Sequence, residues 1–157
     1  MVRLRQARAD DAAQLYRWRV DVETERQSIA PPPESFDGHR RWLDRVLDDS
    51  DVALYIAYDD ERAVDVGTVR IDRRGDREAE ISITVDPGQR GRGYSRELIA
   101  RGIEAAGDVR VVARVKPENI RSLRAFRALG FDGPEDGHGE LVRLVRARAN
   151  LTERTDA

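Results

Sequence analysis

The stretch with the clearest chemical content runs from Val85 to Ser95 and reads Val-Asp-Pro-Gly-Gln-Arg-Gly-Arg-Gly-Tyr-Ser. A β-rich segment ends there, Gly91 and Gly93 follow close together, and a helical pattern begins directly afterwards. Glycine lets the backbone approach a ligand and take positive φ, and free amides at a helix start attract anions. The pattern indicates an anion-binding loop suited to a pyrophosphate. The alternative interpretation is an ordinary turn that contains glycine. It is not a P-loop, because no Gly-Lys-Ser/Thr follows. It is not a dinucleotide-binding fingerprint either, because the third glycine of that motif is missing.

A second element follows at 115–126, Val-Lys-Pro-Glu-Asn-Ile-Arg-Ser-Leu-Arg-Ala-Phe, and closes with Leu-Gly-Phe at 129–131. The two elements together resemble the GNAT superfamily, the GCN5-related acetyltransferases. The family loop pattern Arg/Gln-x-x-Gly-x-Gly/Ala is matched from Arg90 onward, and Ser95 replaces its last residue. In the second element, Asn119 matches the family asparagine that contacts the pantetheine arm and phosphates.

The resemblance implies that acetyl-CoA is the co-substrate and that its pantetheine arm lies between two splayed parallel strands. A backbone amide in the region 83–85 would polarise the thioester carbonyl. We expect Tyr94 to act as an apolar anchor of the loop rather than as a proton donor. The residues expected at the cofactor are Ile83, Thr84, Val85, Arg90, Gly91, Arg92, Gly93, Tyr94, Ser95, Asn119, Ser122 and Phe126.

Direct transfer of the acetyl group to an amine suits this chain, because it has no cysteine to carry an acyl intermediate. Glu80 stands where many family members place a carboxylate base, and a glutamate at a strand edge is the alternative interpretation. Phe126 occupies the position where the family commonly has a tyrosine acid. Water or the Ser122 hydroxyl would then protonate the departing thiolate.

The amino-terminal third is expected to form the acceptor pocket. Arg19 and Arg26, followed by His39 three residues before Trp42, resemble a GNAT subgroup that acts on nucleotide-linked amino sugars. Arginine could hold a diphosphate and aromatic rings could stack on a sugar or base. The alternative is that Trp18, Trp42 and His39 pack in the core. Other acceptors left open are a protein amino terminus or lysine and a drug-like amine, and a non-catalytic acyl-CoA-binding sensor is the alternative of another class.

The elements that must position these residues follow from periodicity and breakers. We expect strands over 2–8, 52–58, 64–71, 80–85, 109–115 and 141–145. Helices are expected from an Asp10 cap through Val22, from a Ser35 cap through Leu47, over 93–106 and over 118–129. This order predicts an α/β (α+β) GNAT fold: a mixed, mostly antiparallel sheet of six to seven strands, with splayed central parallel strands and about four helices. One domain over 1–146 and a tail over 147–157 account for the chain.

Composition narrows the class of protein further. The chain has 157 residues, 37% of them charged, and a net charge of −2, with Lys116 the single lysine among 28 basic residues. A nucleic-acid partner is not expected, because bulk electrostatic binding needs a basic chain. No apolar run reaches membrane-span length, and no metal is expected with two histidines and no cysteine. We therefore expect a cytoplasmic enzyme with a small amine partner; homodimerisation is open, since no face is apolar enough to argue it.

Overall fold

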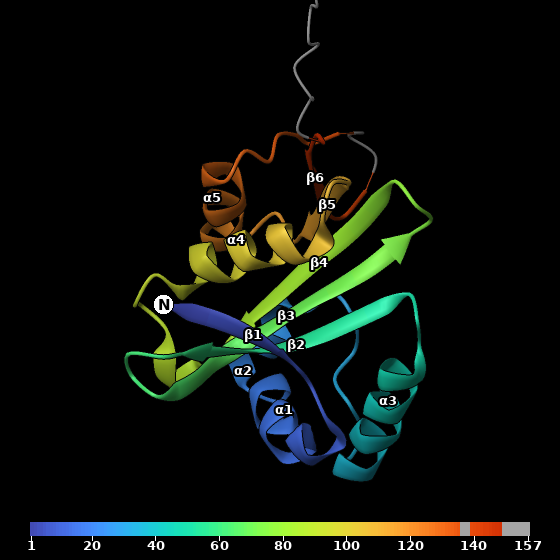
Figure 1. Ribbon diagram of the computed structural model, residues 1–157, viewed down its shortest axis with the longest axis vertical. Helices are drawn as coiled ribbons and strands as arrows, with labels where there is room; N and C mark the ends of the chain where they lie inside the picture. Colours follow the sequence, from blue (N-terminus) through green and yellow to red (C-terminus); the bar gives the residue numbers. More distant parts are fainter. Residues whose placement is uncertain (136–138, 149–157) are drawn as a thin grey trace, which may run out of the picture.

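The computed structural model describes residues 1–135 and 139–148 (Figure 1). Six strands form one sheet in the order β1-β2-β3-β4-β5-β6. Every neighbouring pair is antiparallel except β4 and β5, which run parallel. The strands are β1 (Val2–Gln6), β2 (Val52–Asp59), β3 (Val64–Arg74), β4 (Glu78–Val85), β5 (Arg110–Val115) and β6 (Val142–Arg146). The expected fold class is confirmed, with all six predicted strands present.

The predicted first helix is two helices in the structure. After the 3-10 turn η1 (Ala9–Asp11), α1 (Ala12–Arg19) ends and α2 (Val22–Gln27) begins, with Asp21 as its N-cap. The expectation that Val22 continues the apolar stripe is wrong, since this residue is 71% exposed. Asp10 is also not the helix cap, because it lies inside η1.

The remaining helices follow the sequence pattern closely. The predicted Ser35 cap of α3 (Phe36–Asp48) is confirmed, since its side chain accepts a hydrogen bond from the Gly38 amide at 3.0 Å. The 3-10 turn η2 (Pro87–Gln89) leads into α4 (Tyr94–Ala106), and α5 (Ile120–Ala128) follows β5. Helix α4 lies flat on the sheet because Gly102 has no side chain; a Cβ there would come 2.7 Å from Ile81 Cδ1.

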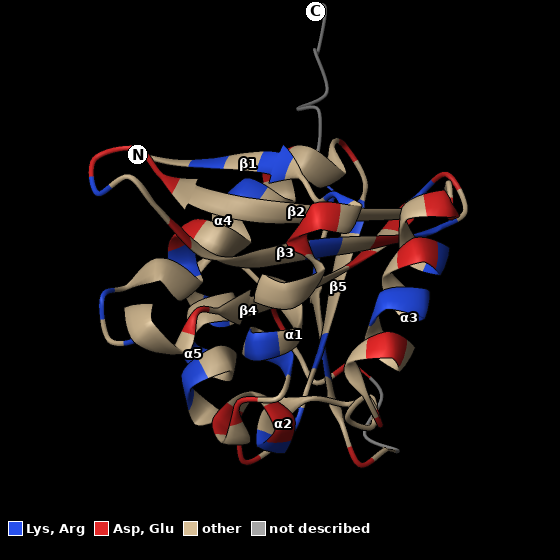
Figure 2. Cartoon of the chain, turned by 90° about the horizontal axis from the view of Figure 1, so that it is seen from below, with Lys and Arg blue, Asp and Glu red and all other residues tan. Residues whose placement is uncertain are grey.

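The helices cover opposite faces of the sheet (Figure 1). Helices α4 and α5 lie over one face, where Ala79 and Ile81 of β4 enter the main core with Leu98 and Phe131. Helices α1 and α3 cover the other face at β2 and bury Ile56 in a second cluster. Because successive residues of a strand alternate between faces, Glu78, Glu80 and Ser82 point to the α1–α3 face. Charges of both signs are intermixed along α3 (Figure 2).

The parallel pair β4–β5 comes apart after three residues. Their pairing joins 78 to 110, 79 to 111 and 80 to 112 and then stops, although both strands continue. The sheet is thus split between the second half of β4 and the end of β5, as the family resemblance implied. Among the described residues no helix is long and apolar enough to cross a membrane. The predicted tail lies mostly outside the described residues, and the domain boundary at 146 stays a prediction.

Candidate active site

The split in the sheet exposes backbone polar groups of β4. The Asp86 amide donates to the Val66 carbonyl at 2.8 Å. This bond shows which alternate residues of β4 direct their backbone groups toward β3 in the antiparallel pair. Even-numbered residues of β4, Thr84 among them, therefore direct their amides and carbonyls toward β3, and Ile83 and Val85 direct theirs toward the split. Of the three residues expected to bind the pantetheine arm, two thus have backbone groups in position, whereas Thr84 is used inside the sheet.

The glycine loop lies where β4 gives way to α4. Gly91 and Gly93 have φ of 77° and 83°, and Gly93 is the N-cap of α4. A Cβ at either glycine would meet no atom within 4 Å, so no other side chain occupies the space beside these positions. The first amides of α4 and the left-handed glycines form a concavity suited to a phosphate. Ser95 and the exposed Arg92 flank it, and Arg92 makes no ion pair with any residue the structure describes.

Helix α2 lies across the open end of the split and is attached on both sides. Arg90 Nη2 donates to Asp21 Oδ2 at 2.5 Å and to Thr24 Oγ1 at 3.0 Å, which joins the loop after β4 to the start of α2. Lys116, the residue after β5, donates to the Arg26 carbonyl at 2.7 Å at the other end of that helix. The Arg90 guanidinium, expected at the cofactor phosphates, is therefore ion-paired with α2, and it holds the pKa of the Asp21 carboxyl below its usual range.

Tyr94 and Phe126 both face the core. Tyr94 is 5% exposed, and its hydroxyl donates to Asp59 Oδ2 at 2.5 Å and accepts from Arg62 at 3.1 Å. The expectation that it anchors the loop fits this packing. Phe126 is 3% exposed and packs edge-on against Phe131 with ring centroids 5.0 Å apart. Its ring therefore fills the core between α5 and the sheet, and its contact with the cofactor stays a prediction.

Asn119 begins α5. Its side-chain oxygen accepts a hydrogen bond from the Ser122 amide at 3.2 Å, so it caps the helix beside the end of β5. Ser122 is half-buried one turn into the helix. Arg121 and Arg124 are exposed on its outer side, and Arg127 donates to the Gly133 carbonyl at 3.4 Å. The cap explains the asparagine without a cofactor, and its expected contact with the pantetheine arm remains untested.

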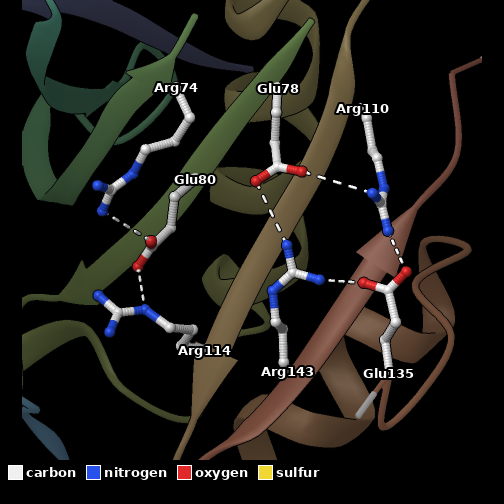
Figure 3. Close-up of polar contacts among 7 residues, drawn as sticks. All are labelled: Arg74, Glu78, Glu80, Arg110, Arg114, Glu135 and Arg143. Carbon is white, nitrogen blue, oxygen red and sulfur yellow. Dashed lines mark hydrogen bonds and ion pairs between the residues drawn. The ribbon is translucent and has the colours of Figure 1, made fainter.

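Glu80 lies at the point where β4 and β5 separate, as the last β4 residue paired with β5. Its side chain is 15% exposed, and both of its oxygens are occupied. Arg114 Nε of β5 donates to Oε1 at 2.8 Å and Arg74 Nη2 of β3 to Oε2 at 3.4 Å (Figure 3). The candidate base is therefore clamped between two guanidinium groups, and its role as the base stays a prediction.

Beside this clamp lies a closed ring of four charged residues, shown in Figure 3. Arg110 and Arg143 each pair with both Glu78 and Glu135. The ring is neutral and joins β4, β5 and β6 on the same face as Glu80. A hollow of about 580 Å³ touches it through Glu78 and Arg110 and lies where β4 and β5 begin, away from the glycine loop.

The three residues expected to bind the acceptor have different environments. Arg19 donates to the carbonyls of Ala30 and Pro31 at 2.8 and 2.9 Å, and its Nη1 is buried with no partner among the described residues. Arg26 is exposed and pairs with Glu23 at 3.1 Å. His39 is 3% exposed, and its Nδ1 has no partner in the described part of the chain.

His39 packs between α1 and α3 rather than in an open pocket. Its ring lies 5.5 Å from Tyr16 and 5.1 Å from Trp42, centroid to centroid. Burial, together with the nearby Arg19 charge, lowers the pKa of His39. A buried histidine packed against two aromatic rings matches the core alternative for this position, and its contact with an acceptor stays a prediction. The expected core role of Trp18 fits its 6% exposure.

The split sheet, the glycine loop and the capped helix after β5 together form the arrangement that the resemblance to GNAT acetyltransferases implied. Residues 2–132 match the model of the acetyltransferase (GNAT) domain, and the chain belongs to this family. The structure is similar to spermidine N-acetyltransferase from Vibrio cholerae in complex with CoA and spermine, with a TM-score of 0.76 and 20% identity over 92% of this chain and 91% of that chain. It is also similar to the aminoglycoside acetyltransferase AAC(6')-Ib in complex with ribostamycin and coenzyme A, with a TM-score of 0.80 and 20% identity over 99% of both chains.

A protein of Mycobacterium leprae is 32% identical over 103 residues, which are 62% of this chain. The chain spans only 29% of the length of that relative. The two solved structures are named for the acetylation of spermidine and of aminoglycosides. They give no support to the narrower resemblance to the subgroup that acts on nucleotide-linked amino sugars.

Several residues at the site were not predicted from the sequence. Arg74 and Arg114 clamp Glu80, and Asp21 holds Arg90. The alternation of charged and apolar residues in 110–115 indicates which side chains share a face. It does not reveal which residue of β5 stands beside Glu80, because that requires the register of the parallel pair.

Proposed function

We propose that this chain transfers an acetyl group from acetyl-CoA directly to a primary amine of a small molecule. The observation that carries the proposal is the split of β4 from β5, with free backbone groups of Ile83 and Val85 directed into it. The pantetheine arm would lie there as an added strand, and the glycine loop before α4 would receive the pyrophosphate. Family membership supports acetyl-CoA as the co-substrate.

In this reaction the neutral amine nitrogen bonds to the carbonyl carbon of the thioester, and the carbon–sulfur bond breaks. An amide of β4, from Ile83 or Val85, would donate to the developing oxyanion. The proton of the amine would leave through Glu80, directly or by way of water, and the CoA thiolate would take up a proton in turn. Phe126 cannot supply that proton, so water or Ser122 is the proposed source.

The acceptor is tested with a panel of amines. Release of the CoA thiol is followed with amino sugars, nucleotide-linked amino sugars, peptides, polyamines and aminoglycosides, and the acetylated product is identified by mass spectrometry. Turnover with at least one small amine is the expected result. Turnover confined to peptides would instead indicate acetylation of a protein amino terminus or lysine.

A second candidate function is an acyl-CoA-binding sensor without turnover. It is favoured by one observation, the pairing of both Glu80 oxygens with Arg74 and Arg114, because an incoming amine must compete with two guanidinium groups for the carboxylate. Calorimetry with acetyl-CoA, taken together with turnover in the amine panel, separates the two functions. Tight binding together with no acceptor in the whole panel would favour the sensor.

A further inference from the structure

The charged side chains around Glu80 have an unequal distribution of free hydrogen-bonding groups. Both carboxylate oxygens of Glu80 accept a hydrogen bond, whereas each arginine donates to this carboxylate from only one of its nitrogens. Arg114 contributes Nε, and Arg74 contributes Nη2. The other guanidinium nitrogens of this pair make no hydrogen bond to any residue in 1–135 or 139–148. Each oxygen of Glu80 keeps further lone-pair capacity, but the unused guanidinium donors outnumber the unused carboxylate acceptor sites at this point of the sheet.

Exposure follows the same pattern. The side chains of Arg114 and Arg74 are 41% and 60% exposed, whereas that of Glu80 is 15% exposed. Two guanidinium groups against one carboxylate leave a local charge of one positive unit. Figure 3 shows the two guanidinium groups on either side of the carboxylate, from strands β3 and β5. A ligand approaching the start of the split from the α1–α3 face thus meets arginine before it meets glutamate.

The other carboxylates on this part of the face are already paired. Glu78 and Glu135 belong to the four-membered ring with two arginines. Asp72 accepts two hydrogen bonds from Arg70, each 2.8 Å long. A polycation would meet only carboxylates whose charge arginine already balances. An anion would meet guanidinium edges that are free.

We infer that the acceptor is an amine that also carries an anionic group, a phosphate or a carboxylate, and that Arg74 and Arg114 select it. This inference rests on the proposed function and names the substrate class of the same site. The anionic group lies on the free edges of the two guanidinium groups, where arginine binds phosphate or carboxylate through two parallel hydrogen bonds. The amine then lies beside Glu80, at the start of the split that leads to the thioester.

The test uses matched amines that differ in the anionic group. Glucosamine is compared with glucosamine 6-phosphate, cadaverine is compared with lysine, and spermidine serves as the polycation. Affinity for the CoA-loaded protein is measured by calorimetry, and kcat/KM is measured with acetyl-CoA. A charge-assisted pair predicts a preference of about tenfold or more for the anionic member, and the preference should fall as salt is added. The phosphate and carboxylate pairs distinguish the two sources of the anion.

The variants Arg114→Gln and Arg74→Gln should each reduce that preference by about tenfold and leave acetyl-CoA affinity unchanged. Arg101→Gln is the matched control, because Arg101 pairs with Glu104 on α4, over the opposite face. Circular dichroism confirms that each variant is folded. Equal affinity for both members of each pair, tighter binding of spermidine, or an unchanged preference in both variants would overturn the inference.

Turnover and binding separate the two proposals. Acetylation of glucosamine and glucosamine 6-phosphate with equal kcat/KM and equal affinity would contradict the inference that the acceptor carries an anionic group. It would still support the proposed acetyl transfer. Selective binding of the anionic amines without any product would retain the acceptor class and contradict the proposed function.

Discussion

Arg90 Nη2 lies 2.5 Å from Asp21 Oδ2, so a residue of the glycine loop is ion-paired with the N-cap of a helix 69 residues earlier in the chain. The two side chains are 29% and 24% exposed, so solvent screens the pair only in part. The contact joins the loop proposed to hold the pyrophosphate to α2, which borders the open end of the split. If the loop binds the cofactor as proposed, that binding would be linked to the position of α2 through one guanidinium group.

The variant Asp21→Asn tests the strength of this link. Asparagine retains the N-cap hydrogen bond to Thr24 but loses the charge that pairs with Arg90. Because the folded-state pKa of Asp21 is lowered, its contribution to stability is present above the unfolded pKa and is lost as pH falls through the folded one. We expect a loss of about 1 kcal/mol in the free energy of unfolding near neutral pH, shrinking in acid.

Urea unfolding at several pH values measures this difference. Glu104→Gln is the control, since its exposed pair with Arg101 on α4 should contribute less than about 0.5 kcal/mol. An Asp21→Asn difference that is the same in acid and at neutral pH would show that the charge on Asp21 contributes nothing.

The glycine loop can be tested with three equivalent substitutions. Gly75, in the β3–β4 turn, and Gly91 and Gly93, in the loop, have φ of 69°, 77° and 83°, and none has an atom within 4 Å of a would-be Cβ. Alanine at each should therefore cost a similar amount, about 1–2 kcal/mol of backbone strain. Only Gly91→Ala and Gly93→Ala should also weaken acetyl-CoA binding, because only there would the methyl group obstruct a phosphate.

Calorimetric titration with acetyl-CoA, corrected for the folded fraction, gives the comparison. A weakening of about tenfold or more at the two loop positions, against no change in Gly75→Ala, is the expected outcome. Unchanged affinity in all three variants would mean that the phosphates are bound elsewhere.

The fold could be predicted largely because each strand is short, patterned and bounded by turn residues. Glu80 to Val85 is apolar on alternate positions, and the structure extends it only backward to Glu78. The prediction of one first helix was wrong. Leu15, Trp18 and Val22 have helical spacing, but Asp21 caps a new helix between Trp18 and Val22. Helical periodicity alone does not distinguish one long helix from two helices with a cap inside the pattern.

The candidate site was predictable where the backbone makes it and less so where side chains do. Gly91 and Gly93 take left-handed conformations that the sequence indicates directly. Arg90 was expected at a phosphate, and its actual partner, Asp21, depends on a packing contact between distant segments. Pairings such as Glu80 with Arg114 require the parallel register, which local sequence does not contain.

His39 predicts a pH dependence of folding stability. Burial and the Arg19 charge lower its folded-state pKa, so the folded protein resists the proton that the unfolded chain accepts. Stability should therefore fall as pH drops below about 6.5, by at most about 1.4 kcal/mol per pH unit. His39→Phe should remove that slope below about pH 6.5 and leave the stability above that pH independent of pH by this cause. Parallel stability curves for the two proteins would show that His39 does not contribute.

Glu80→Gln tests the proposed base against a purely structural role. Glutamine cannot accept the amine proton, so kcat should fall about 10²- to 10⁴-fold, whereas the dissociation constant of acetyl-CoA should stay the same. Glu78→Gln is the matched control, because Glu78 lies two residues away on the same face of β4 and is ion-paired with two arginines of its own. The ratio of the two effects decides the role: equal losses in both variants, or full activity in Glu80→Gln, would leave Glu80 as the residue that holds Arg74 and Arg114 and no more.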